Sequence, residues 1–273
     1  SCMKIKKPLL TAGICLAFAF VLFSCQKEAA SDGSNIPAGK SQFDIMLTDD
    51  PSILFDSIFI NIQKVEVKTE DSAGIERWEA LNIRPGIYNI LRFRNGLDTL
   101  LATGYVPTGE VKKIRISIGN GNYAMKNGVT VPLTLHPSDA VLTLDVSGGW
   151  DNAGVRHFRI WLDVDGHGSI RLKSDGTYEL RLKLSHFCRR NSGEIEGEIK
   201  PSDALPAVVQ AVSGNDTLTA IAGREGEFKI RGIRGSSATI IIRPSNGYKD
   251  SVINNVPVRL GEDTKLGKIV LHR

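Results

Sequence analysis

The chain has 273 residues, of which 41% are hydrophobic and 23% charged, and it carries a formal net charge of +4. This length is enough for one large domain or two ordinary ones. Three of the positive charges, Lys4, Lys6 and Lys7, lie together near the N-terminus, so the charge gives no argument for nucleic-acid binding. Downstream of residue 24 the cysteines are Cys25 and Cys188, so a disulfide framework is excluded if Cys25 is modified.

Residues 1–24 are predicted to be an export signal that begins at Met3. The apolar run over residues 9–23 is too short for a comfortable bilayer span and is typical of a signal peptide. It ends in Leu22-Phe23-Ser24-Cys25, which resembles the lipobox of bacterial lipoproteins. The resemblance implies lipid transfer to the Cys25 thiol, cleavage between Ser24 and Cys25, and acylation of the new amino group, which together give a lasting membrane anchor. An ordinary secretory signal with a chance cysteine is the alternative.

Residues 25–40 are polar and small, without hydrophobic periodicity, and are predicted to be a flexible tether. Gln26-Lys27-Glu28 resembles the charged signals that send some lipoproteins to the outer face of the outer membrane, although a solvated linker explains it equally well. We therefore expect a protein anchored by lipid to the outer membrane. The sequence does not decide whether it lies on the periplasmic face or on the cell surface.

Residues 41–188 are rich in β-branched side chains that alternate with polar ones, which predicts a β-rich domain. A change of phase at Gln63-Lys64 predicts a bulge in a long strand. Asn120-Gly121 and Asn127-Gly128 are hairpin-type turns, and a short helix fits around Leu91 and Phe93. The expected strands cover residues 41–48, 57–68, 76–81, 111–118, 129–135, 141–146, 156–164, 169–173 and 177–184.

Residues 191–273 are predicted to form a second domain of about seven short strands, a number and spacing typical of a small antiparallel sandwich. These strands are expected over residues 193–200, 207–212, 217–222, 226–230, 238–243, 252–256 and 266–271. The fold class predicted for the whole chain is therefore all-β, with two β-sandwich domains.

An ordered series of short signatures over residues 40–188 resembles the family called domain of unknown function 4382, found in bacterial surface lipoproteins. The signatures include Leu47-Thr48-Asp49-Asp50-Pro51, Phe55-Asp56-Ser57-Ile58, Trp78 with Leu81, Pro107-Thr108-Gly109-Glu110 and Gly176-Thr177-Tyr178-Glu179-Leu180. The family has no established activity, so the resemblance implies a β-rich extracytoplasmic domain and nothing more specific.

The C-terminal segment is similar to the transthyretin-like, carboxypeptidase-regulatory-like sandwiches of bacterial surface proteins. The matching stretches are Ile195-Glu196-Gly197-Glu198-Ile199, Gly226-Glu227-Phe228-Lys229-Ile230, Gly232-Ile233, Asn255-Val256-Pro257-Val258 and Gly267-Lys268-Ile269-Val270-Leu271. This resemblance implies a seven-stranded sandwich that acts as a rigid spacer or an interaction module, without catalytic residues.

The most metal-like string is Asp163-Val164-Asp165-Gly166-His167-Gly168. Asp163 and Asp165 are candidate calcium ligands, because calcium prefers oxygen ligands on a tight glycine turn. The string lacks a third acidic position and the distal glutamate of a calcium loop. The alternative interpretation is a hairpin turn with solvated aspartates, and beyond calcium no cofactor is expected.

Other chemistry-bearing residues have simpler interpretations. The histidines lack zinc-site spacing, although His157 and His167 flank one predicted hairpin, and Cys188 is interpreted as structural. Asp49-Asp50-Pro51 is interpreted as a turn that follows a strand. Trp150 follows two glycines in a predicted loop and is the candidate glycan-contacting side chain, with core packing as the alternative.

These features favour a membrane-tethered, non-catalytic module that binds or assembles a protein or glycan partner. One alternative is a fimbria-like or adhesin subunit, which should present a long exposed strand or groove for strand exchange. A second alternative is an enzyme, which requires the loops around Asp49, Trp150 and Asp163 to converge on a pocket.

Overall fold

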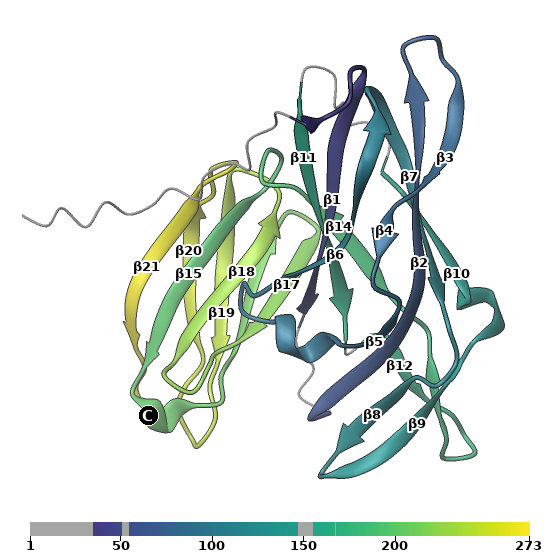
Figure 1. Ribbon diagram of the computed structural model, residues 1–273. Helices are drawn as coiled ribbons and strands as arrows, with labels where there is room; N and C mark the ends of the chain where they lie inside the picture. Colours follow the sequence, from purple (N-terminus) through teal and green to yellow (C-terminus); the bar gives the residue numbers. More distant parts are fainter. Residues whose placement is uncertain (1–34, 51–54, 147–154, 167) are drawn as a thin grey trace, which may run out of the picture. The chain divides into compact units, whose positions relative to one another are not determined.

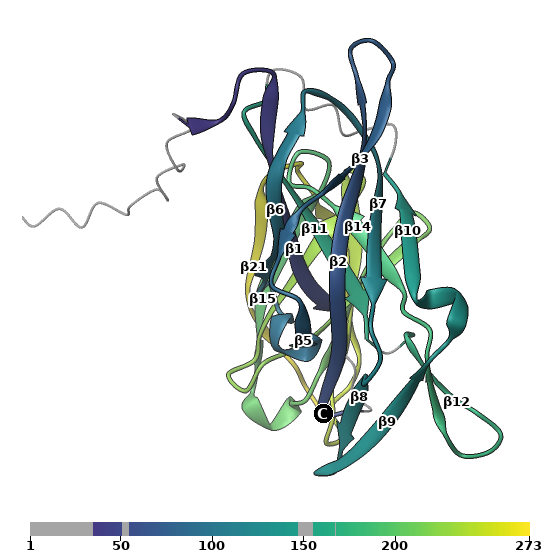
Figure 2. The same cartoon turned by 45° about the vertical axis from the view of Figure 1, so that its right-hand side comes forward.

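The first part of the chain forms two β-sheets that pack face to face (Figures 1 and 2). The computed structural model describes residues 35–273 except 51–54, 147–154 and 167. The smaller sheet has the order β14-β11-β1-β6-β4. Its strands are β1 (Lys40–Asp50), β4 (Asn82–Ile83), β6 (Thr99–Pro107), β11 (His157–Asp165) and β14 (Leu184–Phe187).

The larger sheet has the order β10-β7-β2-β8-β9-β13-β12, and β3 and β5 also pair with β2. Its strands are β2 (Ser57–Asp71), β3 (Glu76–Ala80), β5 (Gly86–Asn89), β7 (Gly109–Ile118), β8 (Tyr123–Lys126), β9 (Val129–Leu135), β10 (Val141–Asp145), β12 (Ile170–Leu172) and β13 (Tyr178–Leu180). Two short 3₁₀ helices, η2 (Ile90–Phe93) and η3 (Pro137–Asp139), connect strands.

Alternation of side chains supplies the core between these two sheets, since successive residues of a strand point to opposite faces. From β1, Phe43 and Ile45 point inward, and from β2, Ile58 and Ile60 do the same, each at most 1% exposed. The ring of Phe43 stacks on Phe158 of β11 with centroids 5.4 Å apart. Burying each such side chain contributes roughly 1.5–3 kcal/mol, so this core is the main source of stability for the first sandwich.

Residues 193–270 carry seven strands in two further sheets, which enclose a separate core (Figure 1). The three-stranded sheet has the order β18-β15-β21 and the four-stranded sheet the order β17-β16-β19-β20. The strands are β15 (Gly193–Lys200), β16 (Val208–Ser213), β17 (Asp216–Ile221), β18 (Glu227–Ile233), β19 (Ser237–Arg243), β20 (Ser251–Pro257) and β21 (Asp263–Val270), with the 3₁₀ helix η4 (Ser202–Ala204) after β15. We call this the second sandwich.

The predicted all-β class with two sandwiches is confirmed. The bulge predicted at Gln63-Lys64 is confirmed as well, because the pairing of β2 with β7 shifts between Ile62 and Lys64. The short helix expected near Leu91 is η2. Residues 35–273 cluster as one compact unit, and the predicted boundary between residues 188 and 191 stays a prediction.

Two predicted hairpins are wrong, and for the same reason: the chain changes partners where a hairpin was expected. The turn at Asn120-Gly121 joins β7 to β8, but both strands pair with β2 and not with each other. The turn after Asp165 leads from β11 in the smaller sheet to β12 in the larger sheet. The strand β6, which pairs with β1 along its length, was not predicted from the sequence. In the described part of the chain, no helix is long and apolar enough to cross a membrane.

Candidate functional site

The outer face of the smaller sheet carries a row of side chains that contact the second sandwich. Residues that pair directly across neighbouring strands share a face. In this register Met46 of β1 lies opposite Trp161 of β11, and Trp161 lies opposite Phe187 of β14. One step further along, Thr48, Asp163 and Ser185 form the next row. The pairing of β1 with β11 therefore places Trp161 and Asp163 on the side away from the core.

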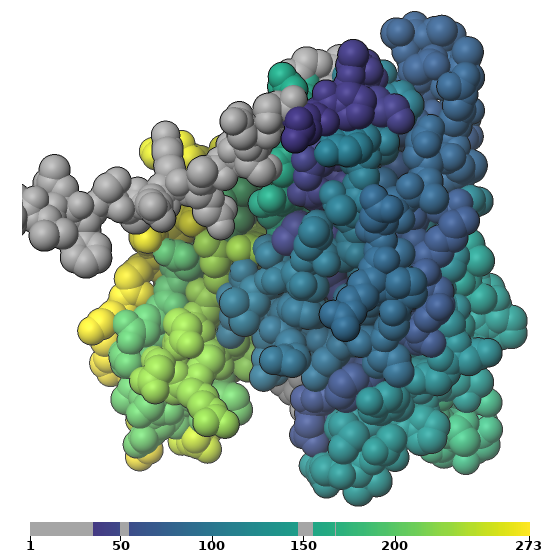
Figure 3. All heavy atoms as spheres, viewed as in Figure 1, coloured from purple at the N-terminus to yellow at the C-terminus, as the bar shows by residue number. Residues whose placement is uncertain are grey.

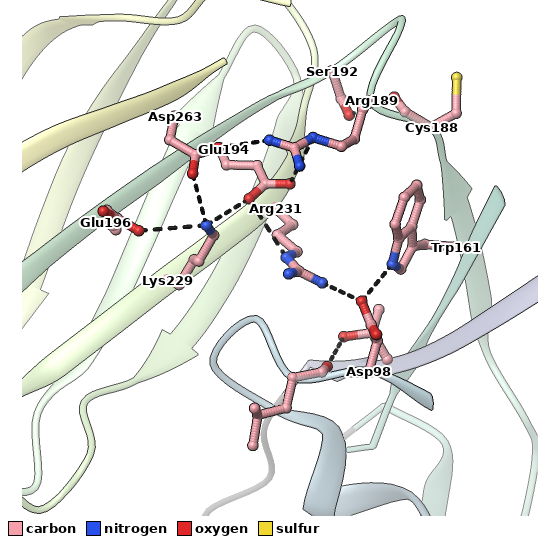
Figure 4. A network of polar contacts seen from close by, with 12 residues as sticks. Asp98, Trp161, Cys188, Arg189, Ser192, Glu194, Glu196, Lys229, Arg231 and Asp263 are labelled. Atoms are coloured by element: carbon pink, nitrogen blue, oxygen red, sulfur yellow. Dashed lines mark hydrogen bonds and ion pairs between the residues drawn. The ribbon is translucent and has the colours of Figure 1, made fainter. Parts of the chain in front are cut away.

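Trp161 anchors a polar contact between the two sandwiches, shown in Figure 4. Its indole Nε1 donates a 2.7 Å hydrogen bond to Oδ2 of Asp98, and Nη1 of Arg231 on β18 lies 2.7 Å from the same oxygen. The indole also stacks on the ring of Phe187, with centroids 5.7 Å apart and planes 6° apart. One carboxylate oxygen of Asp98 thus joins the first sandwich to the second. Trp161 is only 8% exposed at this contact.

The same contact continues into a cluster of charges on the second sandwich (Figure 4). The carboxylate of Glu194, which is 5% exposed, lies 2.8 Å from Nζ of Lys229, 3.6 Å from Nε of Arg231 and 3.8 Å from Nε of Arg189. Lys229 also pairs with Asp263 at 3.0 Å and Glu196 at 3.4 Å. We call these residues, together with Asp98 and Trp161, the junction network.

In the junction network, charge pairing has a larger effect on pKa values than burial has. Burial alone would lower the pKa of Lys229, but hydrogen bonds to Glu194 and Asp263 raise that pKa above its ordinary value. Burial would raise the pKa of Asp263, but the bond from Lys229 holds that pKa below its ordinary value. Both groups are therefore charged at neutral pH, and removing one partner would leave another charge partly buried and unpaired.

The atoms of the two sandwiches meet in the space-filling view (Figure 3). Two glycines lie at this contact. Gly96, with φ of +77°, lies against Lys229, and a Cβ there would be 2.7 Å from the Lys229 side chain. Gly232, with φ of +79°, lies against Phe187, and a Cβ there would be 2.9 Å from its ring. Both positions combine a left-handed backbone with a lack of space, so each favours glycine.

Beside the junction network is an open hollow of about 410 Å³, which we call the Asp163 hollow. Both sandwiches line it, since Asp163 and Ser185 come from the first while Thr217, Leu218 and Arg234 come from the second. Burial, with the nearby charge of Asp165, raises the pKa of Asp163 from its ordinary value of 3.8 to about 7. A half-buried carboxyl group with such a pKa in a hollow is a common mark of a functional site.

A second, much smaller cavity of about 20 Å³ is also lined by Asp163. Asp49 and Asn95 line it together with Lys229 and Arg231. The structure therefore brings together Asp49 and Asp163, two of the three residues whose convergence an enzyme would need. The volume is enough for about one water molecule, so it leaves no room there for a substrate.

The candidate metal ligands Asp163 and Asp165 lie at the end of β11, two residues apart and on one face. The expectation of solvated aspartates in a hairpin is wrong for Asp163, which is half-buried because it faces residues of the second sandwich. Asp165 is held by its own turn, since its Oδ1 accepts a 2.6 Å hydrogen bond from Gly168 N–H. No group of three or more metal-ligating side chains gathers among the described residues. Ser24, Cys25, Trp150 and His167 lie outside the described residues.

A further polar cluster, which was not predicted from the sequence, lies on the same outer face of the smaller sheet, nearer the start of β1. Asp44 of β1, 4% exposed, accepts 2.6 Å hydrogen bonds from Thr103 of β6 and from Nε2 of His157. Burial would raise the pKa of Asp44, but hydrogen bonds from Thr103, His157 and Gln42 hold it below its ordinary value. His157 thus bonds to Asp44 on the neighbouring strand β1, while His167 lies outside the described residues.

The residues of the junction network have only a weak sequence signal. Lys229 and Arg231 alternate with the buried Phe228 and Ile230, so the pattern shows that they point outward from β18. It does not show what they meet, because Asp98 lies 133 residues before Arg231. Only the tertiary arrangement identifies these side chains as a contact between sandwiches.

The fold and its junction define an all-β protein of two sandwiches with a polar, composite surface between them. Residues 40–181, more than half of the chain, match the family described as "Domain of unknown function (DUF4382)". The chain belongs to this family. No curated protein is significantly similar to it in sequence.

Solved structures show only distant likeness. A chain of a type II cohesin–X-dockerin complex from Acetivibrio cellulolyticus is 23% identical over 29% of this chain and 56% of its own, with a TM-score of 0.24. The Bacillus anthracis TIE protein is 10% identical over 85% of this chain and 34% of its own, with a TM-score of 0.21. The shaft pilin SpaA from Lactobacillus rhamnosus GG is 10% identical over 85% of this chain and 97% of its own, with a TM-score of 0.20. The chain thus spans about half the length of the first of these proteins, and scores this low carry no inference about function.

Proposed function

We propose that this chain is a cell-envelope lipoprotein, anchored to the outer membrane through Cys25, which acts as a non-catalytic binding or assembly module for a protein or glycan partner. The observation that carries the proposal is the junction between the sandwiches. Half-buried charge pairs such as Arg231 with Asp98 join the sandwiches, which have separate cores. The resulting composite surface includes the Asp163 hollow, which neither sandwich could form alone.

The anchor and tether suit such a role. The lipobox-like Leu22-Phe23-Ser24-Cys25 would fix the chain to the membrane, and residues 26–40 would hold the sandwiches a short distance from it. A flexible tether of this length has a root-mean-square reach on the order of 20 Å. The resemblance of the second sandwich to transthyretin-like domains supports a rigid interaction module, because such domains commonly serve as spacers or docking units.

The alternative of a fibre-forming adhesin subunit requires an edge strand that is ready to pair with another chain. β21 lies at the end of the three-stranded sheet and is the natural candidate. It carries Lys265, whose side chain is 74% exposed, and Lys268, and lysines on an edge strand disfavour edge-to-edge pairing. The charges on β21 therefore favour the binding module over the fibre subunit.

The binding role is tested by photo-cross-linking in the envelope of a Gram-negative host. A photoreactive residue replaces Thr217 on the rim of the Asp163 hollow, and in a matched control it replaces Val129, which is 63% exposed on β9. We expect a discrete adduct from position 217 and none from position 129. Equal labelling at both positions, or none at either, would contradict the binding role assigned to this surface.

A further inference from the structure

The packing of the sandwiches does not explain why Asp163 lies in the hollow. Among the described residues, its carboxyl group makes no hydrogen bond and no ion pair, whereas its neighbours in the junction network are all paired. A carboxylate taken partly out of water without a donor destabilises the folded state. A ligand that supplies hydrogen-bond donors to Asp163 would remove this cost.

The groups around Asp163 indicate what kind of ligand could do so. Hydroxyl groups of Ser185 and Thr217 can both donate and accept, and the carboxylate of Asp216 accepts. The guanidinium of Arg234 is held in place by a 2.7 Å hydrogen bond to the carbonyl oxygen of His186, and its other N–H groups remain able to donate. Leu218 adds an apolar surface.

This combination fits a neutral ligand with many hydroxyl groups. Both signs of charge are present in the lining, so a strongly anionic or cationic ligand would meet repulsion as well as attraction. A sugar ring presents hydroxyls that donate to carboxylates, oxygens that accept from a guanidinium, and C–H faces that contact an apolar side chain. The volume of about 410 Å³ lies within the range of small-ligand sites.

We propose that the Asp163 hollow binds a sugar unit of a glycan, with Asp163 and Asp216 accepting hydrogen bonds from its hydroxyls and Arg234 donating to its oxygens. The inference rests on the proposed binding role and makes it specific. It names the glycan, and not a protein, as the partner recognised at this surface.

The test uses the full chain in detergent and a panel of neutral hexoses, N-acetylhexosamines and their disaccharides. Binding is measured by saturation-transfer NMR and calorimetry at pH 8. We expect at least one sugar to bind the wild type, and Asp163→Asn to lower the affinity for that sugar about tenfold. Asp250→Asn, the same change at an exposed position away from the hollow, should bind as the wild type does.

Three results would overturn the inference: no sugar binds the wild type, Asp163→Asn binds as tightly as the wild type, or calcium or a primary amine occupies the hollow instead. Thr217→Val provides a second variant at an exposed position, should Asp163→Asn perturb the fold. If sugars fail but position 217 still cross-links to a protein, the glycan inference falls and the binding role stands. If both fail, the binding role falls as well.

Discussion

Replacing Asp98 by alanine should measure how much the junction network stabilises the protein. Asp98 accepts hydrogen bonds from Trp161 and Arg231 through a single oxygen, with both partners mostly buried. A hydrogen bond to a charged group contributes about 1.5–3 kcal/mol, and loss of the acceptor leaves the indole N–H of Trp161 buried without a partner. Arg231 keeps Glu194 at 3.6 Å, which limits the loss on that side. We expect Asp98→Ala to lower the free energy of unfolding by about 2–3 kcal/mol.

The assay is urea denaturation followed by tryptophan fluorescence, to which Trp161 contributes from within the contact. Asp250→Ala is the matched control, since its carboxylate is 63% exposed and lies 4.0 Å from Arg243, so its loss should cost less than about 0.5 kcal/mol. A double-mutant cycle of Asp98→Ala with Arg231→Ala should give a coupling energy of about 1 kcal/mol. A free energy of unfolding for Asp98→Ala within about 0.5 kcal/mol of the wild-type value would show that this contact does not stabilise the fold.

Three further predictions concern a glycine and two aspartates. Gly232→Ala should lower the free energy of unfolding in urea by about 1–3 kcal/mol more than Gly247→Ala, because both have φ of +79° but only at Gly232 does a Cβ clash, 2.9 Å from Phe187. For Asp44, whose pKa is lowered, the stabilisation is present above its unfolded-state pKa and is lost as pH falls through the folded-state pKa, so Asp44→Asn should flatten the acid limb of a stability–pH profile. For Asp163, whose pKa is raised to about 7, the folded state binds the proton more tightly, so stability falls as pH rises from about 4 to 7. Asp163→Asn should therefore be more stable than the wild type at pH 8, by at least about 1.4 kcal/mol in thermal or urea unfolding; equal stability at pH 5 and pH 8 in both proteins would contradict this.

The fold class could be predicted because it depends on local patterns. The alternation of Ile58, Ile60 and Ile62 against polar neighbours marks β2 as half-buried, and the phase change after Ile62 marks its bulge. In contrast, β6 contains Gly104 and a mixture of polar and apolar residues on both faces, so local alternation does not reveal it. Its place is fixed by pairing with β1, which is a long-range property.

The site could be predicted only in part, for the same physical reason. Asp163 and Asp49 could be selected from the sequence because they are acidic residues at the ends of predicted strands. Both line the small cavity at the junction. The parallel pairing of β1 with β11 decides that Asp163 faces the second sandwich, and nothing in either strand alone specifies that pairing. Trp161 likewise lies on the outer face of the smaller sheet, where it donates a hydrogen bond to Asp98, a contact that no local pattern predicts.

The most direct test of the central claim, an envelope lipoprotein that presents two sandwiches to a partner, is acyl labelling of the full chain in a Gram-negative host. Cells expressing the wild type or Cys25→Ala are fed an alkyne-tagged fatty acid and then separated into membrane and soluble fractions. We expect a labelled wild-type protein in the membrane fraction, and a Cys25→Ala protein that carries no label and leaves that fraction. A Cys25→Ala protein that is still labelled and membrane-bound would show that the chain is not anchored through Cys25.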